Sequence, residues 1–493
     1  MIHSVTTPYA KILVSTETGM INIQSKLPQT NANFDYDVLS FQTNRDLNQD
    51  CATFSLTLVY RNEWYKRIGS NDLVVISLAR PPEELKEVFI GLVDDIRKTT
   101  DYSTGKPTRA FRIVGRNLNK ALVSFEVGLI SKLSIAGSVN RFLGGQLKIL
   151  ALQRAKDILQ AALEIYIDKG CRYEFANGKT LVNYYNYCLD DARGPEDKYV
   201  TEILRDASSY ATFQGNLWTF LKEFKNAPFN EMYWEVGTSI KDFVRLNSDS
   251  PTRTMEKGNQ QDQQDQQEVN ANEYLVFRPT PFNKSAWELL NTSQVTPSEI
   301  VTESLGRSDL ETYTIYDVNS MTLAAQTSKN INGILPFWYE PYYYKYGIRT
   351  LTVSSRYLTT IGLEDISKDG KTYTGTSRDA MLSRMKDVAN WNIKNPQFEN
   401  GTMSVKGSNR FKIAERLYRT DEGIEYYIEG VSHTFDINRG WITNLSLTRG
   451  IAPNERFTPP WGELTQMTPE DAARINERIE AAIGNKGGEK KDG

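Results

Sequence analysis

The chain has 493 residues, with 58 Lys and Arg against 61 Asp and Glu and a formal net charge of −3. Its length predicts roughly three domains at about 150 residues each, ample for sizeable cores. The absence of a global basic field does not favour nucleic acid as a partner. Two His and three Cys are too few and too scattered for a zinc site or a disulfide framework, so we expect reduced cysteines in a reducing cytoplasm.

The chain start does not resemble a targeting segment. It lacks a basic region followed by an apolar one, so we expect no signal peptide. No run approaches about 18 apolar residues, so we expect no membrane span. The 26 Tyr and 8 Trp suit a protein with much interfacial surface, because both side chains bury area while keeping a polar tip.

The first part of the chain reads as strands. Apolar residues alternate with Thr and Ser over 53–60, the pattern recurs over 74–78, and 88–96 is almost continuously apolar. Phe111 and Ile113 follow a turn at 104–107. Strands at this spacing predict an antiparallel barrel or sandwich.

The apolar period changes from about residue 126. A helical stripe predicts a long amphipathic helix over 146–166, and a second helix is expected over 208–225, ended by the segment containing Pro228. A strand at 232–236 follows. The segment 258–268 is rich in Gln and has no apolar side chain, so we expect a flexible loop rather than a Gln-rich aggregation element. Its flanks, 234–236 and 274–277, could be neighbouring strands.

Aromatic residues gather over 337–344, which favours packing or an interface over a carbohydrate platform. A helix is expected at 377–391, with Met381, Leu382, Met385, Val388 and Ala389 inward. Strands then resume from 401 to 450. Within them, Val431, His433, Phe435 and Ile437 share one face, and a short turn with Gly440 leads to a second alternating run. This pattern predicts a β-hairpin with one buried face.

A separate module ends the chain. Thr468 as N-cap, Pro469 at the first helical position and acidic residues in the first turn predict a helix that ends at Gly484. Ile475, Ile479 and Ile483 form one narrow apolar stripe on it. The stripe either folds back on its own domain or docks a partner, and these three residues are our candidate partner-docking residues. We expect 487–493 to be a disordered tail.

We find no pattern that predicts catalysis. The zinc-protease, nucleophile-elbow, phosphate-loop and Cys-x-x-Cys motifs are missing from the sequence. His433 lies mid-strand on the apolar face, so we interpret it as a core histidine. Asp94 and Asp95 are adjacent in a strand and would face opposite ways. Carboxylates of a glycosidase could still hide among the 61 acidic residues. We therefore predict no catalytic residue, no cofactor site and no metal site.

Several segments resemble bacteriophage baseplate and tail hub proteins of the late-control-protein-like type. The carrying segments, in chain order, are Gly91-Leu-Val-Asp-Asp-Ile96 with Phe111-Arg-Ile-Val-Gly-Arg-Asn-Leu118, Gly215-Asn-Leu-Trp-Thr-Phe-Leu221 with Ala227-Pro-Phe-Asn-Glu231, Phe277-Arg-Pro-Thr-Pro-Phe282, and Tyr426-Tyr-Ile-Glu-Gly-Val-Ser-His433 with its return strand. Together they cover about 40 to 450 in family order.

The resemblance implies an α+β, mainly β fold, with two tail-tube-like antiparallel β-barrels near the two ends. The expected domains are a first barrel at 1–125, a helical and mixed insertion at 126–235, a mixed aromatic-rich domain at 236–345 containing the loop 258–268, a second barrel at 346–455, and a spacer, helix and tail at 456–493. Strands at both ends and helices between them agree with the residue patterns. No sequence repeat links the two barrels.

The function implied is mechanical. The resemblance implies a homotrimeric ring in a virion tail or baseplate, assembled in the host cytoplasm, that adapts the sixfold tail tube to a threefold spike or fibre during genome ejection. Implied partners are the tail tube or distal tail protein, the tape measure protein, spike or fibre and baseplate proteins, with DNA only in transit. Two alternatives remain, a tail-associated cell-wall or polysaccharide hydrolase and a host-receptor-binding tail protein.

Overall fold

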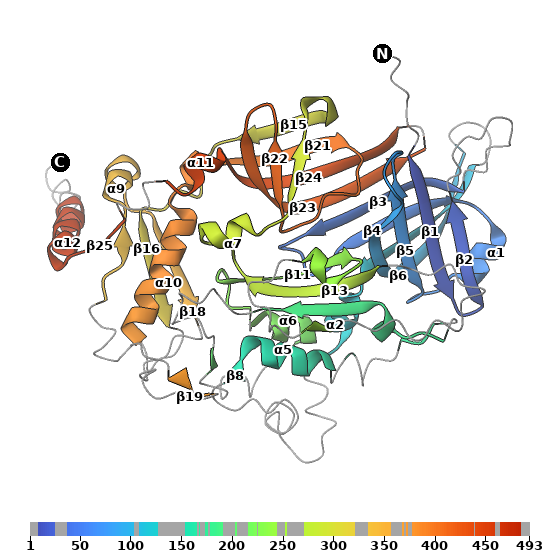
Figure 1. The fold of residues 1–493 in the computed structure, drawn as a ribbon, viewed down its shortest axis with the longest axis horizontal. Coiled ribbons are helices and arrows are strands. Elements are labelled where there is room, and N and C mark those ends of the chain that lie inside the picture. Colours follow the sequence, from blue (N-terminus) through green and yellow to red (C-terminus); the bar gives the residue numbers. More distant parts are fainter. Residues whose placement is uncertain are drawn as a thin grey trace, which may run out of the picture.

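The computed structural model describes residues 8–24, 37–102, 108–126, 153–164, 167, 173–175, 178–190, 203–204, 215–223, 225–243, 252–253, 271–320, 334–355, 367–368, 371–372, 377–437, 439–458 and 464–484. Strands dominate these ranges, so the mainly β fold class is confirmed (Figure 1). The Gln-rich segment 258–268 and the tail 487–493 lie outside them. Within these ranges, no helix combines the length and the apolar character needed to cross a membrane.

The largest element is a sheet of 13 strands built from both ends of the chain. Its N-terminal half-sheet contains β1 (Tyr9–Thr16), β2 (Gly19–Gln24), β3 (Val38–Asp46), β4 (Thr53–Val59), β5 (Leu73–Ala79), β6 (Lys86–Asp101) and β7 (Thr108–Asn117). Its C-terminal half-sheet contains β14 (Thr292–Val295), β15 (Ile300–Gly306), β21 (Glu399–Lys406), β22 (Arg416–Arg419), β23 (Ile424–Asp436) and β24 (Gly440–Ile451). The expected early strands and the C-terminal hairpin are thereby confirmed.

Strand β23 joins the two half-sheets. Its first residues pair with β22, and the stretch from Gly430 to Asp436 pairs on the same side with β3. The sequence patterns predict β23 but not this pairing, because β3 and β23 lie far apart in the chain. Pairing among the described strands does not close either half-sheet on itself. Two closed barrels therefore stay a prediction.

A second sheet lies against the large one and has the order β11-β13-β9-β12 (Figure 1). Its strands are β9 (Tyr185–Leu189), β11 (Asn230–Gly237), β12 (Thr252–Arg253) and β13 (Asn272–Pro279). β11 pairs antiparallel with β13, with Trp234 opposite Leu275, so the flanks of the Gln-rich segment are indeed neighbouring strands. This pair crosses the expected boundary at residue 235, whereas the domain ranges as a whole stay a prediction.

The helices beneath this sheet are shorter than the apolar pattern predicts. The described ones are α2 (Lys120–Ser124), α5 (Ala155–Leu163) and α6 (Leu217–Glu223). The stretch just before α5 is strand β8 (Gln153–Arg154), which pairs with β10 (Ile203–Leu204). α6 begins only at Leu217 because the Asn216 side chain accepts from the Thr219 N–H at 2.8 Å, and Asn216 is bridged to Glu126. The expected start at 208 lies outside the described residues.

A third sheet forms a separate module at one end of the molecule (Figure 1). Its order is β18-β16-β17-β25, from β16 (Ile315–Ser320), β17 (Phe337–Trp338), β18 (Thr350–Ser355) and β25 (Thr465–Gln466). Helices α9 (Glu340–Tyr346), α10 (Ser377–Asn392) and α12 (Pro469–Gly484) belong to it. Met381, Met385, Val388 and Ala389 of α10 are buried as expected, whereas Leu382 is half-buried. Other short α-helices and strands are α1 (Asn62–Arg67), α7 (Lys284–Glu288), α11 (Pro453–Arg456), β19 (Ser367–Lys368) and β20 (Lys371–Thr372). Short 3-10 helices lie at Leu181–Asn183, Ile240–Asp242, Pro297–Glu299 and Asn395–Gln397.

The two half-sheets repeat one arrangement of strands. The spatial order β3-β4-β7-β6-β5 in the first corresponds to β15-β21-β24-β23-β22 in the second. Corresponding strands occur in the same chain order, and all these neighbours are antiparallel. The flanking strands differ, because β1 runs antiparallel to β5 and β14 runs parallel to β22. The half-sheets are therefore topological copies without a detectable sequence repeat.

Two irregularities of the half-sheets coincide as well, whereas the register shifts at Ile76/Ser77, Glu399/Gly401 and Glu425/Tyr427 each occur in one half-sheet alone. The register between β6 and β7 skips Asp94, and that between β23 and β24 skips Glu429. The register between β3 and β4 skips Leu39, and that between β15 and β21 skips Val301. A β-bulge bends its strand and increases the local twist. The matching bulges fix a residue-by-residue correspondence between the half-sheets.

A third coincidence lies just before β5 and β22. Asn71 and Ala414 both adopt left-handed backbone conformations, with φ of 65° and 62°. The Asn71 N–H donates to the Val93 carbonyl at 2.9 Å, and the Ala414 N–H donates to the Ile428 carbonyl at 2.8 Å. Non-glycine residues seldom adopt this conformation. Its occurrence at matching sites supports the correspondence independently of the bulges.

Candidate functional site: a polar sheet face between two free edges

One face of the large sheet is polar across both half-sheets. The register aligns short hydroxyl and amide side chains from strand to strand, for example Ser304 with Thr402 and Thr402 with Ser446. All members are exposed or half-buried. We define this polar face by Ser40, Gln42, Asn44, Ser55, Thr57, Arg97, Thr99, Arg112, Thr302, Ser304, Thr402, Ser404, Ser432, Thr434, Asn444 and Ser446.

The polar face carries no dominant charge. Asp95, Asp436 and Lys406 lie on the same face as Arg97 and Arg112, so both signs are represented. Arg97 and Asp95 form an ion pair with each other. A surface without a strong positive field does not hold a polyanion by counterion release. The face can therefore border a path for a charged polymer without binding it tightly.

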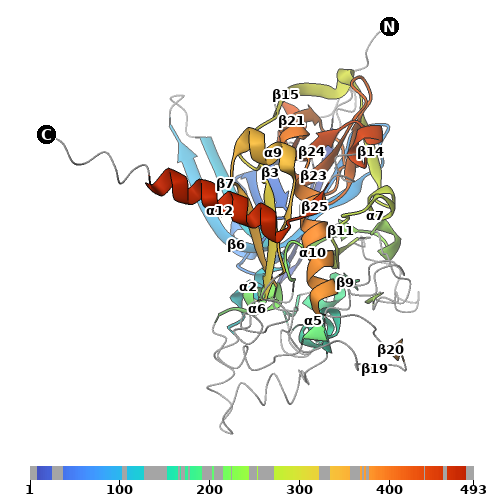
Figure 2. The ribbon, with the colours of Figure 1, turned by 90° about the vertical axis from the view of Figure 1, so that its left-hand side faces the viewer.

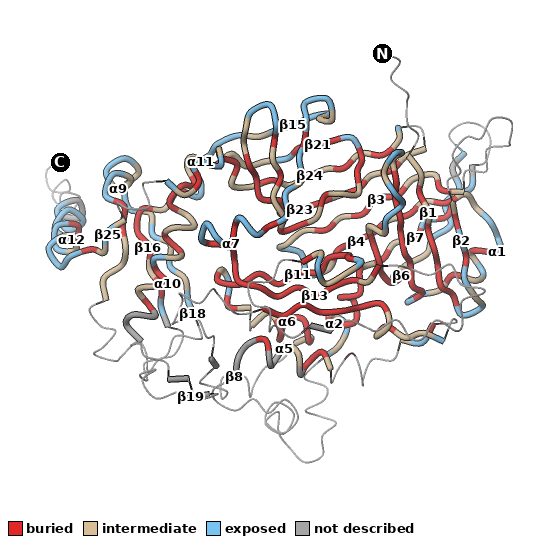
Figure 3. Tube along the Cα trace, viewed as in Figure 1, coloured by how far each residue is buried: buried red, intermediate tan, exposed pale blue. Residues whose placement is uncertain are grey.

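The opposite face of the sheet is the protein core. Phe41, Phe54, Phe111, Met403 and Leu445 alternate with the polar residues and are almost completely buried (Figure 3). Together with the second sheet and α2, α5 and α6, they form continuous apolar clusters. This strict alternation gives the sheet one solvated side and one packed side.

A buried ion pair anchors the second sheet to the N-terminal half-sheet. Arg45 of β3 donates to Glu273 of β13 at 3.0 Å, and Glu235 of β11 lies 3.5 Å from the same guanidinium. Glu273 is completely buried and also accepts from the Leu118 N–H at 2.8 Å and from Asn117 at 3.0 Å. Burial raises the pKa of Glu273, although Arg45 and these donors oppose the shift.

A corresponding pair anchors the C-terminal half-sheet. Arg278 of β13 donates to Glu231 of β11 at 3.0 Å and to the Ala414 carbonyl at 2.6 Å. The Tyr427 hydroxyl of β23 donates to the same carboxylate at 2.5 Å. Buried charges persist when they are paired and fully hydrogen-bonded. The second sheet is thus fixed to both half-sheets through one arginine on each side.

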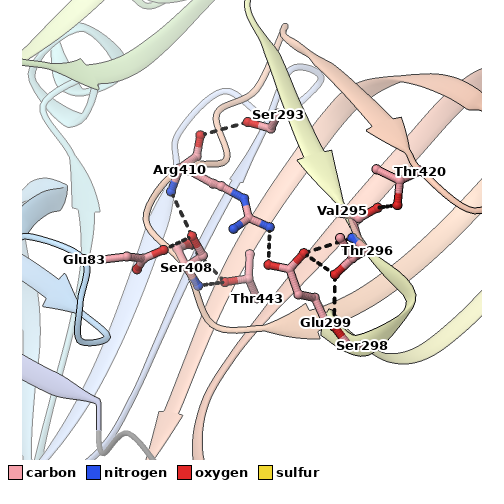
Figure 4. A network of polar contacts seen from close by, with 10 residues as sticks. All are labelled: Glu83, Ser293, Val295, Thr296, Ser298, Glu299, Ser408, Arg410, Thr420 and Thr443. Carbon is pink, nitrogen blue, oxygen red and sulfur yellow. Dashed lines mark hydrogen bonds and ion pairs between the residues drawn. The ribbon is translucent and has the colours of Figure 1, made fainter.

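The half-sheets also meet through side chains beside the strand junction. Phe41 and Phe435 stack with ring centroids 5.2 Å apart where β3 pairs with β23. Near this pair, the turn after β5 reaches the loop after β21, where the Ser408 hydroxyl donates to Glu83 at 2.5 Å (Figure 4). Arg410 of that loop binds Glu299 at 2.7 Å, which ties the loop to the start of β15.

The first free edge is the outer side of β15. Val301, Thr302, Glu303 and Ser304 are exposed, and among the described strands β15 pairs only with β21. A Cβ placed on Gly306 would meet nothing within 4 Å. The neighbouring turn is acidic. One guanidinium, that of Arg419, lies 2.7 to 3.0 Å from the three carboxylates of Glu303, Asp421 and Glu422.

The second free edge is the end of β6. β5 covers β6 only as far as Leu92, and the stretch from Asp95 to Asp101 keeps β7 as its one partner among the described strands. Arg97 and Lys98 are exposed on it, and Arg109 is exposed on β7 beside it. Unpaired N–H and C=O groups on such an edge are ready to pair with another strand.

Helix α12 protrudes from the third-sheet module (Figure 2). Thr468 caps it as expected, since its hydroxyl accepts from the Asp471 N–H at 3.2 Å. Ile475 is buried against Ile315, Trp338 and Met467, whereas Ile479 is 40% exposed. The Ile483 side chain lies outside the described residues. Contact with its own chain thus accounts for Ile475, and partner docking by Ile475, Ile479 and Ile483 stays a prediction.

The described residues offer no catalytic arrangement around His433. Its Nδ1 lies 3.1 Å from the Thr443 hydroxyl and accepts from the Trp441 indole at 3.3 Å. Burial first, and then Arg45, lower its pKa to about 3, so the ring is neutral. The interpretation as a core histidine is confirmed. Over the described residues, His, Cys, Asp and Glu do not gather in a group of three or more that could hold a metal ion.

Sequence reasoning missed the residues that build this site. Arg45, Arg278 and their glutamates occur in strands that otherwise read as half-apolar, so no local pattern marks them as buried. One signal was present but not interpreted. The segments 91–96 and 426–433, both of which carry the family resemblance, contain the two bulge acids Asp94 and Glu429.

No family model matches the chain, and no curated protein matches it either. Among solved structures it is similar to the tail protein from Neisseria meningitidis MC58, at 11% identity over 89% of this chain and 96% of that chain, with a TM-score of 0.47. It is also similar to the 43 kDa tail protein of prophage MuSo2 from Shewanella oneidensis, at 12% identity over 89% and 98%, with a TM-score of 0.46. It is similar as well to the E. coli c3393 protein, a component of the type VI secretion system, at 9% identity over 88% of this chain and 76% of that chain, with a TM-score of 0.38.

Proposed function

We propose that the protein is a structural hub subunit of a bacteriophage or phage-like tail baseplate. Three copies form a ring that adapts the sixfold tail tube to a threefold spike or fibre. The observation that carries this proposal is the internal repeat, because two topological copies of one half-sheet sit side by side. Among the described strands, the end of β6 lacks the partner that β23 has in β3, and β15 lacks the partner that β3 has in β23. A unit of this kind suits head-to-tail assembly into a closed ring.

The polar face supports a channel role. Hydroxyl and amide side chains cover it from β15 through β23 to β6, and its charges include both signs. In the proposed ring this face lines the lumen, where tape measure protein and DNA pass. The tail tube or distal tail protein and the spike or fibre are then the axial partners, and the protein acts in the virion after assembly in the host cytoplasm.

The segments with family resemblance add a second line of support. The Gly91–Ile96 segment lies on β6 and the Tyr426–His433 segment on β23, which are corresponding strands of the two half-sheets. Both cover the matching bulge. Two different segments with family resemblance at one structural position of the two copies fit a hub with two tube-like units per chain.

Electron microscopy of the purified full chain tests the proposal. We expect a threefold ring of three 56.1 kDa chains with six similar lobes and a central opening. A stable monomer, both alone and in the presence of tail tube protein, would contradict it. Zymography on peptidoglycan and capsular polysaccharide tests the hydrolase alternative, and clearing zones there would overturn the purely mechanical role.

A further inference from the structure

We propose that the end of β6 in one copy pairs antiparallel with β15 of a second copy, in the register that β23 and β3 already use within the chain. This inference rests on the proposed function, and it names the partner of both free edges. The contact is heterologous, because each chain offers one edge of each kind. Its occupant is therefore a second copy of this chain.

The register follows from the correspondence between half-sheets. When the bulges at Asp94 and Glu429 are aligned, Ser432 of β23 corresponds to Arg97 of β6, and Thr434 corresponds to Thr99. When the bulges at Leu39 and Val301 are aligned, Gln42 of β3 corresponds to Ser304 of β15, and Asn44 corresponds to Gly306. Within the chain, Ser432 pairs with Asn44 and Thr434 with Gln42. The expected pairs between copies are Arg97 with Gly306, Lys98 with Leu305, Thr99 with Ser304, Thr100 with Glu303, and Asp101 with Thr302.

Both edges are open where this register needs them. Arg97 to Thr100 and Val301 to Ser304 are exposed, unlike Phe41, His433 and Phe435 at the junction within the chain. A Cβ on Gly306 would have open space around it, so the side chain of the facing Arg97 can extend over this position on the polar face. The contact therefore depends on main-chain hydrogen bonds and polar side chains rather than on apolar burial.

Charge complementarity favours the same partner. Lys98 corresponds to His433 and Glu303 corresponds to Phe41. Because His433 and Phe41 point to the same side of the sheet, Lys98 and Glu303 become diagonal neighbours across the strand pair between two copies. The acidic turn with Asp421 and Glu422 corresponds to the turn after β5 that reaches Ser408. In the next copy, the residue that corresponds to Ser408 is Arg61, so we expect the acidic turn to lie near Arg61 of that copy.

Disulfide trapping of the full chain tests the register. Directly opposed strand residues have Cα atoms about 4.5 to 5.5 Å apart, within the range that a disulfide spans. After mild oxidation, we expect the double variant Thr99→Cys with Ser304→Cys to shift from monomer to a covalent ladder that ends at three chains. On a non-reducing denaturing gel, each single variant should run as one chain, and a mixture of the two should give only a two-chain product. The control Asp95→Cys with Ser304→Cys moves one thiol about 13 Å along the strand and should not cross-link.

The outcomes separate this inference from the proposed function. Rings seen by electron microscopy together with an unlinked Thr99 and Ser304 pair would overturn the strand pairing and leave the hub role standing. Cross-linking of the Asp95 control instead of the Thr99 pair would overturn the register. A chain that neither cross-links nor forms rings, with or without tail tube protein, would overturn both.

Discussion

Asp94 and Glu429 occupy the same β-bulge in the two half-sheets, and each accepts a hydrogen bond from the matching position of the neighbouring strand. Arg116 Nε donates to Asp94 at 2.8 Å, and Thr448 Oγ1 donates to Glu429 at 3.1 Å. Burial raises the pKa of Glu429. It opposes ionisation of Asp94 too, but hydrogen bonds from Arg116 and Lys120 outweigh it and lower the pKa of Asp94. The repeat thus keeps the geometry of the bulge while the electrostatics differ.

The buried Glu273 should be essential for the fold. Glu273→Ala leaves the Arg45 guanidinium buried without its closest carboxylate and removes the acceptor of the Leu118 N–H and Asn117. Breaking a buried pair from one side costs about 3 to 5 kcal/mol. We expect chemical denaturation to show a loss in this range. Glu470→Ala on the exposed surface of α12 is the matched control and should stay within about 0.5 kcal/mol.

Glu415 should make stability depend on pH. Burial raises its pKa to about 7 from 4.5, despite the Asn291 amide at 3.0 Å and the charge of Lys412. The folded state therefore holds more protons than the unfolded state between pH 4.5 and 7, so this group's contribution to stability falls as pH rises through that window. Above it, the ionised carboxylate is disfavoured in the folded chain.

The variant Glu415→Gln isolates this effect. The amide keeps the shape and the acceptor for Asn291 but cannot ionise. We expect the variant to be more stable than the wild type by about 1 to 2 kcal/mol at pH 8 and nearly equal to it at pH 4.5. Denaturation curves at both pH values measure the difference in unfolding free energy between the variant and the wild type. His433 has the opposite pH dependence, but it is present in both proteins, so its effect cancels in this difference. An equal gain at both pH values would show that the charge is not the cause.

Helix α12 should divide into a structural part and an exposed part. Ile475→Ser removes an apolar side chain from the cluster with Ile315, Trp338 and Met467, and we expect a loss of about 2 kcal/mol for this module. Ile479→Ser should stay within about 0.5 kcal/mol because the side chain is 40% exposed. Failed tail assembly with Ile479→Ser at normal stability would support docking. Normal assembly would show that Ile479 contacts no partner.

Charge reversal across the proposed interface should be reciprocal. Lys98→Glu and Glu303→Lys each place like charges on one side of the strand pair, and we expect a severalfold weaker association of each variant from a diagonal pair worth about 0.2 to 1 kcal/mol. The double variant should recover most of the affinity measured by analytical ultracentrifugation. Thermal melting of each monomer serves as the control, since Lys98 also lies over the Tyr65 ring at 3.9 Å and Glu303 also binds Arg419 of its own chain at 2.7 Å. Additive losses in the double variant would argue against contact.

The sequence by itself determined the local elements of this protein. Alternation with period two predicted β4, β5 and the hairpin of β23 and β24, and an almost continuous apolar run predicted β6, because these strands contribute apolar residues to the core. Thr468 and Pro469 predicted the start of α12, since capping depends on neighbouring residues. The pairing of β11 with β13 was also foreseen, because both strands flank one low-complexity segment.

The tertiary structure alone decided how these elements combine. The pairing of β3 with β23 joins residues about 390 positions apart, and backbone hydrogen bonds carry no sequence signature of their partner. The repeat is invisible in the sequence because strand order, bulges and the left-handed residues Asn71 and Ala414 are backbone properties, which different side chains can satisfy. Arg45 of the large sheet and Glu273 of the second sheet likewise read as ordinary surface charges, and only the packing of the two sheets buries them. Long-range packing, not local propensity, therefore created the polar face and its two free edges.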